Sequence, residues 1–239
     1  MVNIPIEKIT IISTVDANAE VMHYFLEKVS DYSRGRKFIV ELIIVDDLGL
    51  VGGDNWQVPI QNELISVIFM RNTAPMGQLM SVLRGIHAST GDVLVTIDPD
   101  MAENLTDIDV FIEHYIHGAD VVYGHRVRRD GVSWWRLFFS KIFGYFVLIA
   151  SGGRLHDVNT PMVLLSRFAR AELLSLPGNV GSLKLYMAYR FGRTFVEVPI
   201  VVKELSKKKS SYGFFDICFL FLKDVFAISK FIFYVGLKK

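Results

Sequence analysis

Cysteine and an excess of charge of one sign are both nearly absent from this chain. Cys218 is its only cysteine, so an internal disulfide is excluded and we expect a reducing compartment. The formal net charge is +1, which gives no basic field to favour nucleic acid as a partner. Residues 1–15 carry Glu7 and Lys8 and lack a basic start followed by an apolar run. We therefore expect a first strand there and not a signal peptide.

A long uncharged apolar run is also missing. Residues 214–235 are strongly apolar, but Asp216, Lys223, Asp224 and Lys230 interrupt them. A membrane-spanning helix needs about 20 predominantly apolar residues with few or no charges. Asp216, Lys223 and Lys230 recur every seven residues and form a narrow polar stripe on a helix. The pattern predicts an amphipathic helix at the membrane interface.

Basic residues flank that helix. Lys207, Lys208 and Lys209 precede it and Lys238 and Lys239 follow it, in positions suited to anionic lipid. The alternative is a helical hairpin that packs on the sheet or on a second subunit. We divide the chain into a globular domain, 1–205, and a region of basic loop and amphipathic juxtamembrane helix, 206–239.

Strand-like and helix-like segments alternate through the globular part. The predicted strands are 8–14, 38–45, 64–70, 93–97, 119–123, 158–165 and 194–202, and the predicted helices are 18–29, 77–88, 105–117, 134–150 and 180–190. Alternation of this kind predicts an α/β fold with a mostly parallel, Rossmann-like sheet and flanking helices. With 51% hydrophobic residues the chain can fill one large core.

Acidic pairs follow two of these strands. Asp98 and Asp100 come directly after 93–97, and Asp46 and Asp47 end the strand at 38–45. Parallel α/β sheets bind ligands outside the carboxyl ends of their strands, so these carboxylates are expected at one edge. Oxygen ligands of this kind suit Mg²⁺ or Mn²⁺ held together with a substrate diphosphate. Asp46 or Asp47 is a candidate acceptor for a nucleotide base and ribose.

Three arginines lie beyond the predicted strand 119–123. Arg126, Arg128 and Arg129 are suited to bidentate phosphate binding. In isolation the segment is typical of a solvated basic loop. Its expected place beside the acidic pairs favours a phosphate site instead.

An ordered series of residues resembles the family 2 glycosyltransferases of GT-A fold, and most of all the dolichyl- and undecaprenyl-phosphate sugar transferases. The series is Arg71-Asn72, Gly77-Gln78, Gly85-Ile86, Ala88, Gly91-Asp92, Asp98-Pro99-Asp100, 120–126, Trp135, Ser140, Asp157, 196–199 and Ser210-Ser211-Tyr212. It runs through most of the chain.

The resemblance implies a role for each matched residue. Asp98 and Asp100 would hold the metal and the diphosphate, and Arg126 would lie by the phosphates of donor or acceptor. Ser210 and Tyr212 would belong to a loop that closes on the nucleotide. The complete candidate set is Asp100, Asp157 and Arg126 for catalysis, Asp98 and Asp100 for the metal, and Asp16, Asp46, Asp47, Asp98, Gln78, Arg129, Ser210 and Tyr212 for donor binding.

The chain departs from the family pattern at several places, Leu48-Gly49, Leu205 and Lys208 among them, and two further departures bear on its function. Residues 14–18 read Thr-Val-Asp-Ala-Asn where Pro-x-Tyr-Asn-Glu is usual, and Ala102 replaces a common glutamine. Both departures favour an alternative of another class, a non-catalytic subunit that binds sugar nucleotides or scaffolds a membrane complex.

The expected reaction moves a sugar, with inversion, from a nucleoside diphosphate, UDP favoured, to a polyprenyl phosphate at the cytoplasmic membrane face. The enzyme would be peripheral, with a homo-oligomer or a membrane subunit possible. A phosphate acceptor is already anionic near neutral pH, because its second pKa is about 6. The closest rival acceptor, a sugar hydroxyl, must lose a proton, and Asp157 is the candidate base.

Two further enzyme classes are disfavoured. Gly49, Gly52 and Gly53 do not form the G-x-G-x-x-G pattern of dinucleotide-binding dehydrogenases. Zinc hydrolysis would rest on histidines such as His114 and His117, which we expect to be solvated on a polar helix face.

Overall fold

The structure of the chain is a computed structural model. It describes residues 5–15, 19–49, 63–126, 142, 144–145, 147–149, 151–156, 160, 162–176, 183–202, 226 and 229–230. The strands are β1 (Lys8–Val15), β2 (Ile39–Asp46), β3 (Ile65–Arg71), β4 (Val93–Thr96), β5 (Val121–Arg126), β6 (Val163–Ser166) and β7 (Phe195–Ile200). The helices are α1 (Ala19–Ser33), α2 (Gln78–Ala88), α3 (Ile108–Ile116), α5 (Arg167–Leu174) and α6 (Leu183–Phe191), with 3₁₀ segments η1 (Pro99–Asp107) and η2 (Gly192–Thr194).

The strands form one seven-stranded sheet in the order β3-β2-β1-β4-β6-β5-β7. β6 runs antiparallel to β4 and β5, whereas the pairs β2–β3, β1–β2, β1–β4 and β5–β7 are parallel. β1 and β2 are almost completely buried, as expected for aliphatic strands covered on both faces. The prediction of a mostly parallel α/β sheet is confirmed.

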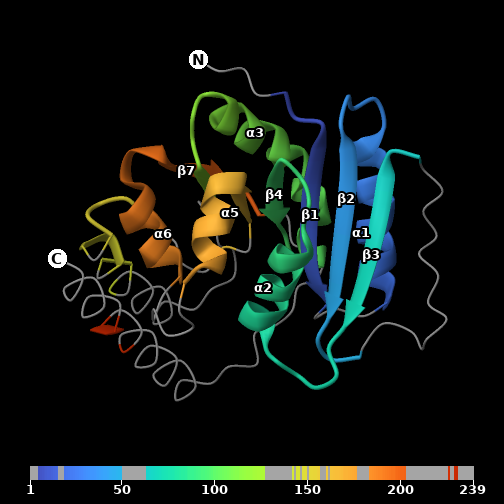
Figure 1. Ribbon diagram of the computed structural model, residues 1–239, viewed down its shortest axis with the longest axis horizontal. Coiled ribbons are helices and arrows are strands. Elements are labelled where there is room, and N and C mark those ends of the chain that lie inside the picture. The colour runs from blue at the N-terminus through green and yellow to red at the C-terminus, as the bar shows by residue number, and fades with distance from the viewer. Residues whose placement is uncertain are drawn as a thin grey trace.

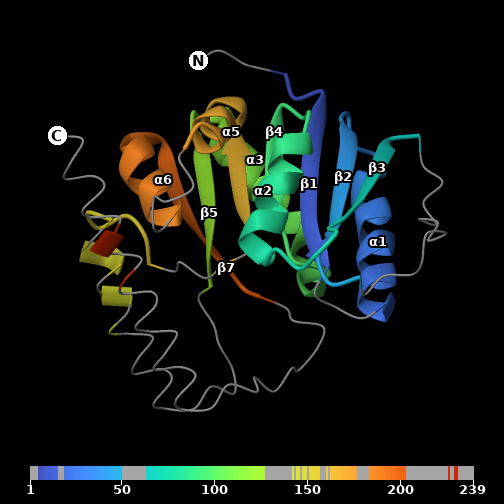
Figure 2. The same ribbon diagram turned by 60° about the horizontal axis from the view of Figure 1, so that its bottom comes forward.

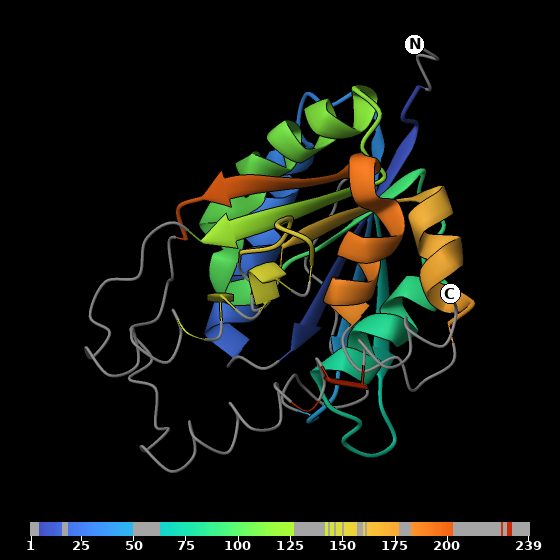
Figure 3. The ribbon, with the colours of Figure 1, turned by 90° about the vertical axis from the view of Figure 1, so that its left-hand side faces the viewer.

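Helices cover both faces of this sheet (Figures 1 and 3). One core lies between the sheet and α1, η1 and α3, with Phe25 and Phe111 fully buried in it. The other lies between the sheet and α2, α5 and α6 and contains Tyr123 and Leu185. Figure 2 shows β5 and β7 side by side at the α6 end of the sheet. Successive side chains of a strand point to opposite faces of the sheet, so neighbouring residues face different cores.

One observed helix was not predicted, and two predicted elements begin at other residues. Helix α5 was not predicted; it is short and buries only Ala169 and Leu173, so its apolar pattern is weak. Its start is fixed by the Ser166 side chain, which accepts a hydrogen bond from the Ala169 backbone N–H. Strand β6 begins at Val163 and not at 158. The 3₁₀ segment η1 precedes α3 and starts at Pro99, earlier than the predicted helix.

Many of the elements predicted for the second half of the chain lie outside the described residues. Within the predicted helix 134–150 the described residues 142, 144–145 and 147–149 are helical. In 206–239 only Phe226, Ser229 and Lys230 are described, all helical, with the Lys230 ammonium 4.8 Å from the centroid of the Phe226 ring. The domain division and the interfacial helix therefore stay predictions. Across the residues that the structure describes, no helix has the length and apolar character needed to cross a membrane.

Candidate active site

The carboxyl ends of β1 to β5 meet at one edge of the sheet. Val15 of β1 pairs with Asp46 of β2, and Asp46 pairs with Arg71 of β3. Ile12 pairs with Thr96, two residues before Asp98. β6 runs the other way, so its start lies at this same edge. The acidic pairs and the end of β5 thus share an edge, as predicted.

Asp47 organises the loop that begins α2. Its carboxylate accepts hydrogen bonds from the Asn72 amide at 2.7 Å and from the backbone N–H groups of Met76 and Gly77 at 2.7 and 2.8 Å. These donors, first the Met76 N–H and then the Asn72 amide, lower the pKa of Asp47 below its ordinary value. Gly77 precedes the helix at φ 83°, a conformation that glycine adopts readily. Asp47 therefore fixes the N-terminus of α2 as an ionised carboxylate.

Gln78 joins this loop to the second acidic pair. It is the first residue of α2, and its side-chain amide donates a hydrogen bond of 3.2 Å to Asp98 Oδ1. Asp98 follows β4 and is partly buried, and Asp100 lies in the first turn of η1. A continuous set of contacts thus leads from Asp47 through residues 76–78 to Asp98.

Asp46 lies in a different environment from Asp47. Its side chain is fully buried and its carboxylate is 3.6 Å from Nε of Arg71. Its main-chain carbonyl accepts the Asn72 N–H at 2.9 Å. Asp46 thus helps to hold the ends of β2 and β3 together, whereas Asp47 is partly exposed.

Ala102, which replaces the usual glutamine of the family, is 1% exposed and packs in the core beside α1 and α3. The position therefore adds no ligand to Asp98 and Asp100. Arg126 is the last residue of β5 and is partly buried at the same sheet edge.

A pocket of about 320 Å³ opens next to Asp98 on the face covered by α2 and α6. Most of its lining is aliphatic, and the residues that bring polar groups are Thr14, Gln78, Thr96, Asp98, Tyr123, Thr160 and Lys184. The Lys184 ammonium donates a hydrogen bond of 3.0 Å to the Thr160 carbonyl. Neither Thr160 nor Lys184 was predicted, because they belong to no motif and meet only through the fold.

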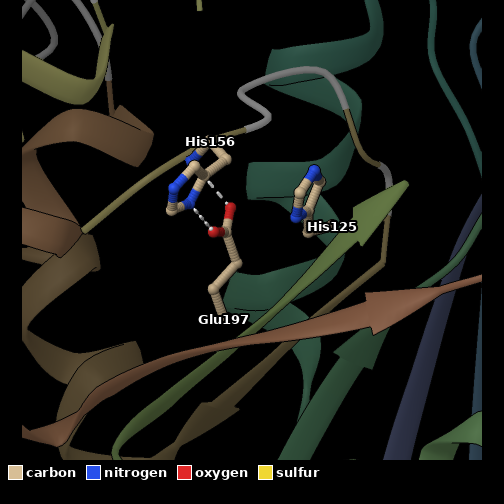
Figure 4. Close-up of side chains that lie close together, drawn as sticks. All are labelled: His125, His156 and Glu197. Carbon is tan, nitrogen blue, oxygen red and sulfur yellow. Dashed lines mark hydrogen bonds and ion pairs between the residues drawn. The ribbon is translucent and has the colours of Figure 1, made fainter. Parts of the chain in front are cut away.

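A second polar cluster lies at the end of β5 (Figure 4). His125 and His156 stack with ring centroids 5.5 Å apart and planes inclined by 12°. Glu197 of β7 accepts hydrogen bonds from the His156 backbone N–H at 2.9 Å and from His156 Nδ1 at 2.5 Å. His156 was not predicted from sequence, and no spacing pattern links these three residues.

Five predicted site residues lie outside the described part of the chain: Asp16, Arg129, Asp157, Ser210 and Tyr212. Their roles stay predictions. The contacts bring Asp47, Gln78 and Asp98 together, and the sheet register places Asp100 and Arg126 at the same edge.

Solved structures with the same arrangement of elements include glucosyl-3-phosphoglycerate synthase from Mycobacterium tuberculosis. Its complex with Mn²⁺, uridine diphosphate and glucosyl-3-phosphoglycerate has a TM-score of 0.64 and 16% identity, over 94% of this chain and 80% of that chain. Its complex with Mn²⁺, UDP-glucose and glycerol 3-phosphate has a TM-score of 0.62 and 15% identity with the same coverage. The predicted GT-A fold is confirmed by this likeness.

Curated relatives include two enzymes named undecaprenyl-phosphate 4-deoxy-4-formamido-L-arabinose transferase. The one from Proteus mirabilis (strain HI4320) is 24% identical over 216 residues, and the one from Photorhabdus laumondii subsp. laumondii is 23% identical over 217 residues. Each alignment takes in 87% of this chain, which spans 64% of the relative's length. The model of the family described as glycosyl transferase family 2 matches residues 10–187, most of the chain. The chain therefore belongs to glycosyl transferase family 2.

Proposed function

We propose that this chain transfers a sugar, with inversion, from a nucleoside diphosphate sugar to a polyprenyl phosphate at the cytoplasmic face of a membrane. The observation that carries the donor half of this proposal is the set of contacts from Asp47 through Gly77 and Gln78 to Asp98. It joins the ends of β2 and β4 to the start of α2. An anionic diphosphate is favoured near a helix N-terminus, and because Asp47 already accepts the Met76 and Gly77 N–H groups, the backbone N–H groups left for it are those of the first turn of α2.

The residues at this edge fit a hard divalent cation. Asp98 is the N-cap residue of η1 and Asp100 lies in its first turn, so the two offer carboxylate oxygens close together in the chain, as Mg²⁺ and Mn²⁺ sites built with substrate phosphates require. When bound, the cation would neutralise charge on the departing diphosphate. In our proposal Gln78 orients Asp98, Asp47 holds the start of α2 in place, and Arg126 adds positive potential for the phosphates.

The acceptor assignment is supported by the names of the curated relatives, which act on undecaprenyl phosphate. A phosphate oxygen that is already ionised attacks without a strong general base. Asp157 then has no obligatory role in proton transfer. The predicted amphipathic region 206–239 would bring the site to the lipid surface.

The donor is tested by thermal unfolding of the intact chain with UDP, GDP, dTDP or CMP, each with and without Mn²⁺. A ligand that binds only the folded state raises the melting temperature. We expect the largest rise with UDP and Mn²⁺ together, and a smaller one with either alone. No rise with any nucleotide in the presence of Mn²⁺ would contradict the donor site.

The acceptor is tested by following sugar transfer from the best donor to undecaprenyl phosphate or to free sugar acceptors. We expect product only with the phosphate. Transfer to a sugar hydroxyl alone would make the chain a glycan-extending enzyme. Nucleotide binding without transfer to any acceptor would favour a non-catalytic subunit.

A further inference from the structure

The cluster of His125, His156 and Glu197 lies outside the donor site described above. We propose that these three side chains bind a divalent transition metal ion of the Zn²⁺ class. Each residue offers one ligand atom, and all three atoms lie within 4.8 Å of one another. Three protein ligands that leave a further position open are a usual arrangement for Zn²⁺.

The sheet brings the cluster together. Tyr123 of β5 pairs with Glu197 of β7, so their side chains share a face of the sheet, and His125 follows two residues later on that same face. His156 reaches the cluster from the segment before β6, tied by its backbone N–H to Glu197. Three separate segments therefore contribute one ligand each (Figure 4).

The donor atoms indicate which metal fits. Imidazole nitrogen with carboxylate oxygen suits Zn²⁺ and its neighbours, whereas carboxylates alone suit Mg²⁺ and Mn²⁺. Ligands about 2.0–2.1 Å from a tetrahedral Zn²⁺ lie roughly 3.4 Å from one another. Small side-chain rotations from the observed arrangement would reach that spacing.

The ligands differ in exposure, so an ion can enter from solvent at one ligand and be held at a more buried one. The His156 side chain is 52% exposed, whereas that of Glu197 is 10% exposed. The observed contact of 2.5 Å between His156 Nδ1 and Glu197 Oε2 is a hydrogen bond. Metal binding would separate these two atoms and replace that bond, since ligating imidazole must be free of the competing proton.

A metal here would join the end of β5 to β7 and to the segment before β6. Arg126 is the residue after His125, so the ion would also brace the strand end that carries this arginine. Binding of the ion in our proposal does not depend on sugar transfer.

The test is titration calorimetry of the tag-free, chelator-treated full chain with Zn²⁺ alone, in a buffer with excess Mg²⁺ to occupy oxygen sites. We expect one Zn²⁺ per chain and a rise in melting temperature. The double variant His125→Gln/His156→Gln should lose at least tenfold in affinity. The matched double variant His114→Gln/His117→Gln, from α3 and its end, and the donor-site variant Asp98→Asn should bind as the parent does.

Absence of saturable Zn²⁺ binding would overturn the proposal, as would binding that survives in His125→Gln/His156→Gln. Loss of binding in Asp98→Asn would place the ion at the donor site instead. Circular dichroism and metal-free unfolding check that each variant folds. If the double variant does not fold, Glu197→Gln and His156→Gln alone carry the test, with a tenfold loss expected in each.

Discussion

Two stretches of one sheet edge offer different chemistry. At the ends of β2 and β4, the polar groups are the carboxylates of Asp47 and Asp98 and the amide of Gln78. At the end of β5, the groups are two imidazoles and Glu197. The first set contains only oxygen ligands for a cation, while the second is mixed nitrogen and oxygen. In our two proposals, one sheet thus presents a hard and a borderline metal site a few strands apart.

The two stretches also differ in how they are built. We call the parallel strands β1 to β4 the parallel half of the sheet. Its carboxylates reach the edge without a change of strand direction, because Asp47 and Asp98 each follow a strand of this half. The cluster around Glu197 depends on the reversed strand β6, which returns the chain so that His156 meets β5 and β7. The direction of β6 therefore decides that His156 lies beside the end of β5.

The largest effect is expected in the oxygen-only stretch. Asp98→Asn or Asp100→Asn should lower sugar transfer by roughly 100-fold while the fold is kept, because each would remove charge that holds the metal and diphosphate in the proposed donor site. Turnover at saturating donor and Mn²⁺ measures this. The control is Asp31→Asn, a carboxylate whose side chain is 50% exposed on α1, and it should transfer at the parent rate. Equal transfer rates in Asp98→Asn, Asp100→Asn and Asp31→Asn would contradict the assignment of Asp98 and Asp100 to the donor site.

Removing a carboxylate should lower the free energy of unfolding more in the parallel half, at Glu41, than at the end of β5, at Glu197. Glu41 of β2 is 4% exposed and accepts hydrogen bonds from Thr10 Oγ1 at 2.7 Å and from the Thr90 N–H at 2.8 Å. Burial alone raises the pKa of Glu41, but these hydrogen bonds outweigh it and the pKa lies below its ordinary value. Glu41→Ala should lower the free energy of unfolding by about 3 kcal/mol, because charged hydrogen bonds are lost and buried donors are left unpaired.

The matched variant is Glu197→Ala without metal. Its partner His156 is half exposed, so water can replace the lost contact and the expected cost is about 1 kcal/mol. Urea unfolding measures both variants. An equal cost in the two would mean that the β5 end is held as firmly as the parallel half.

Alanine substitutions at Gly85 and Gly124 test how closely side chains pack in the parallel half and at the β5 end. A Cβ at Gly85 of α2 would lie 2.7 Å from Cγ2 of Ile12, a stiff β-branched side chain. Overpacking costs about 1–3 kcal/mol and the gain in helix propensity is about 1 kcal/mol, so Gly85→Ala should destabilise by about 1 kcal/mol.

At Gly124 of β5 the nearest atom is the terminal Cδ1 of Ile200, at 2.8 Å. This atom can move by rotation of the side chain, so Gly124→Ala should cost less than Gly85→Ala. Thermal unfolding ranks the two variants. The reverse order would show tighter packing at the β5 end.

The smallest expected effect is the pH dependence of the loop held by Asp47. Its pKa is lowered in the folded chain, so its contribution to stability is fully present above the unfolded value of 3.8 and is lost as pH falls through the folded value. Asp47→Asn should therefore be less stable than the parent at pH 7, and the difference should shrink at acidic pH. Urea midpoints across this range measure it. A constant difference would show that the carboxylate charge is not what holds the loop.

Much of the parallel half could be predicted from the sequence. Each of its strands is a run of aliphatic residues, and Asp47 and Asp98 directly follow such runs. Helix α5 was missed because only two of its side chains are buried, which leaves little periodic signal. The early start of η1 at Pro99 was missed for a related reason, because its turns do not follow the 3.6-residue period.

The sequence by itself determined the α/β class, the oxygen-rich acidic pairs and their place at the strand ends, since these depend on local runs and on the common direction of parallel strands. Only the tertiary structure decided that Asp46 is buried while Asp47 holds the start of α2, because burial depends on neighbouring strands. It also decided the meeting of His125, His156 and Glu197, which lie on three segments. The physical reason is that side-chain contacts across a sheet depend on strand order and direction, and no local sequence pattern carries that information.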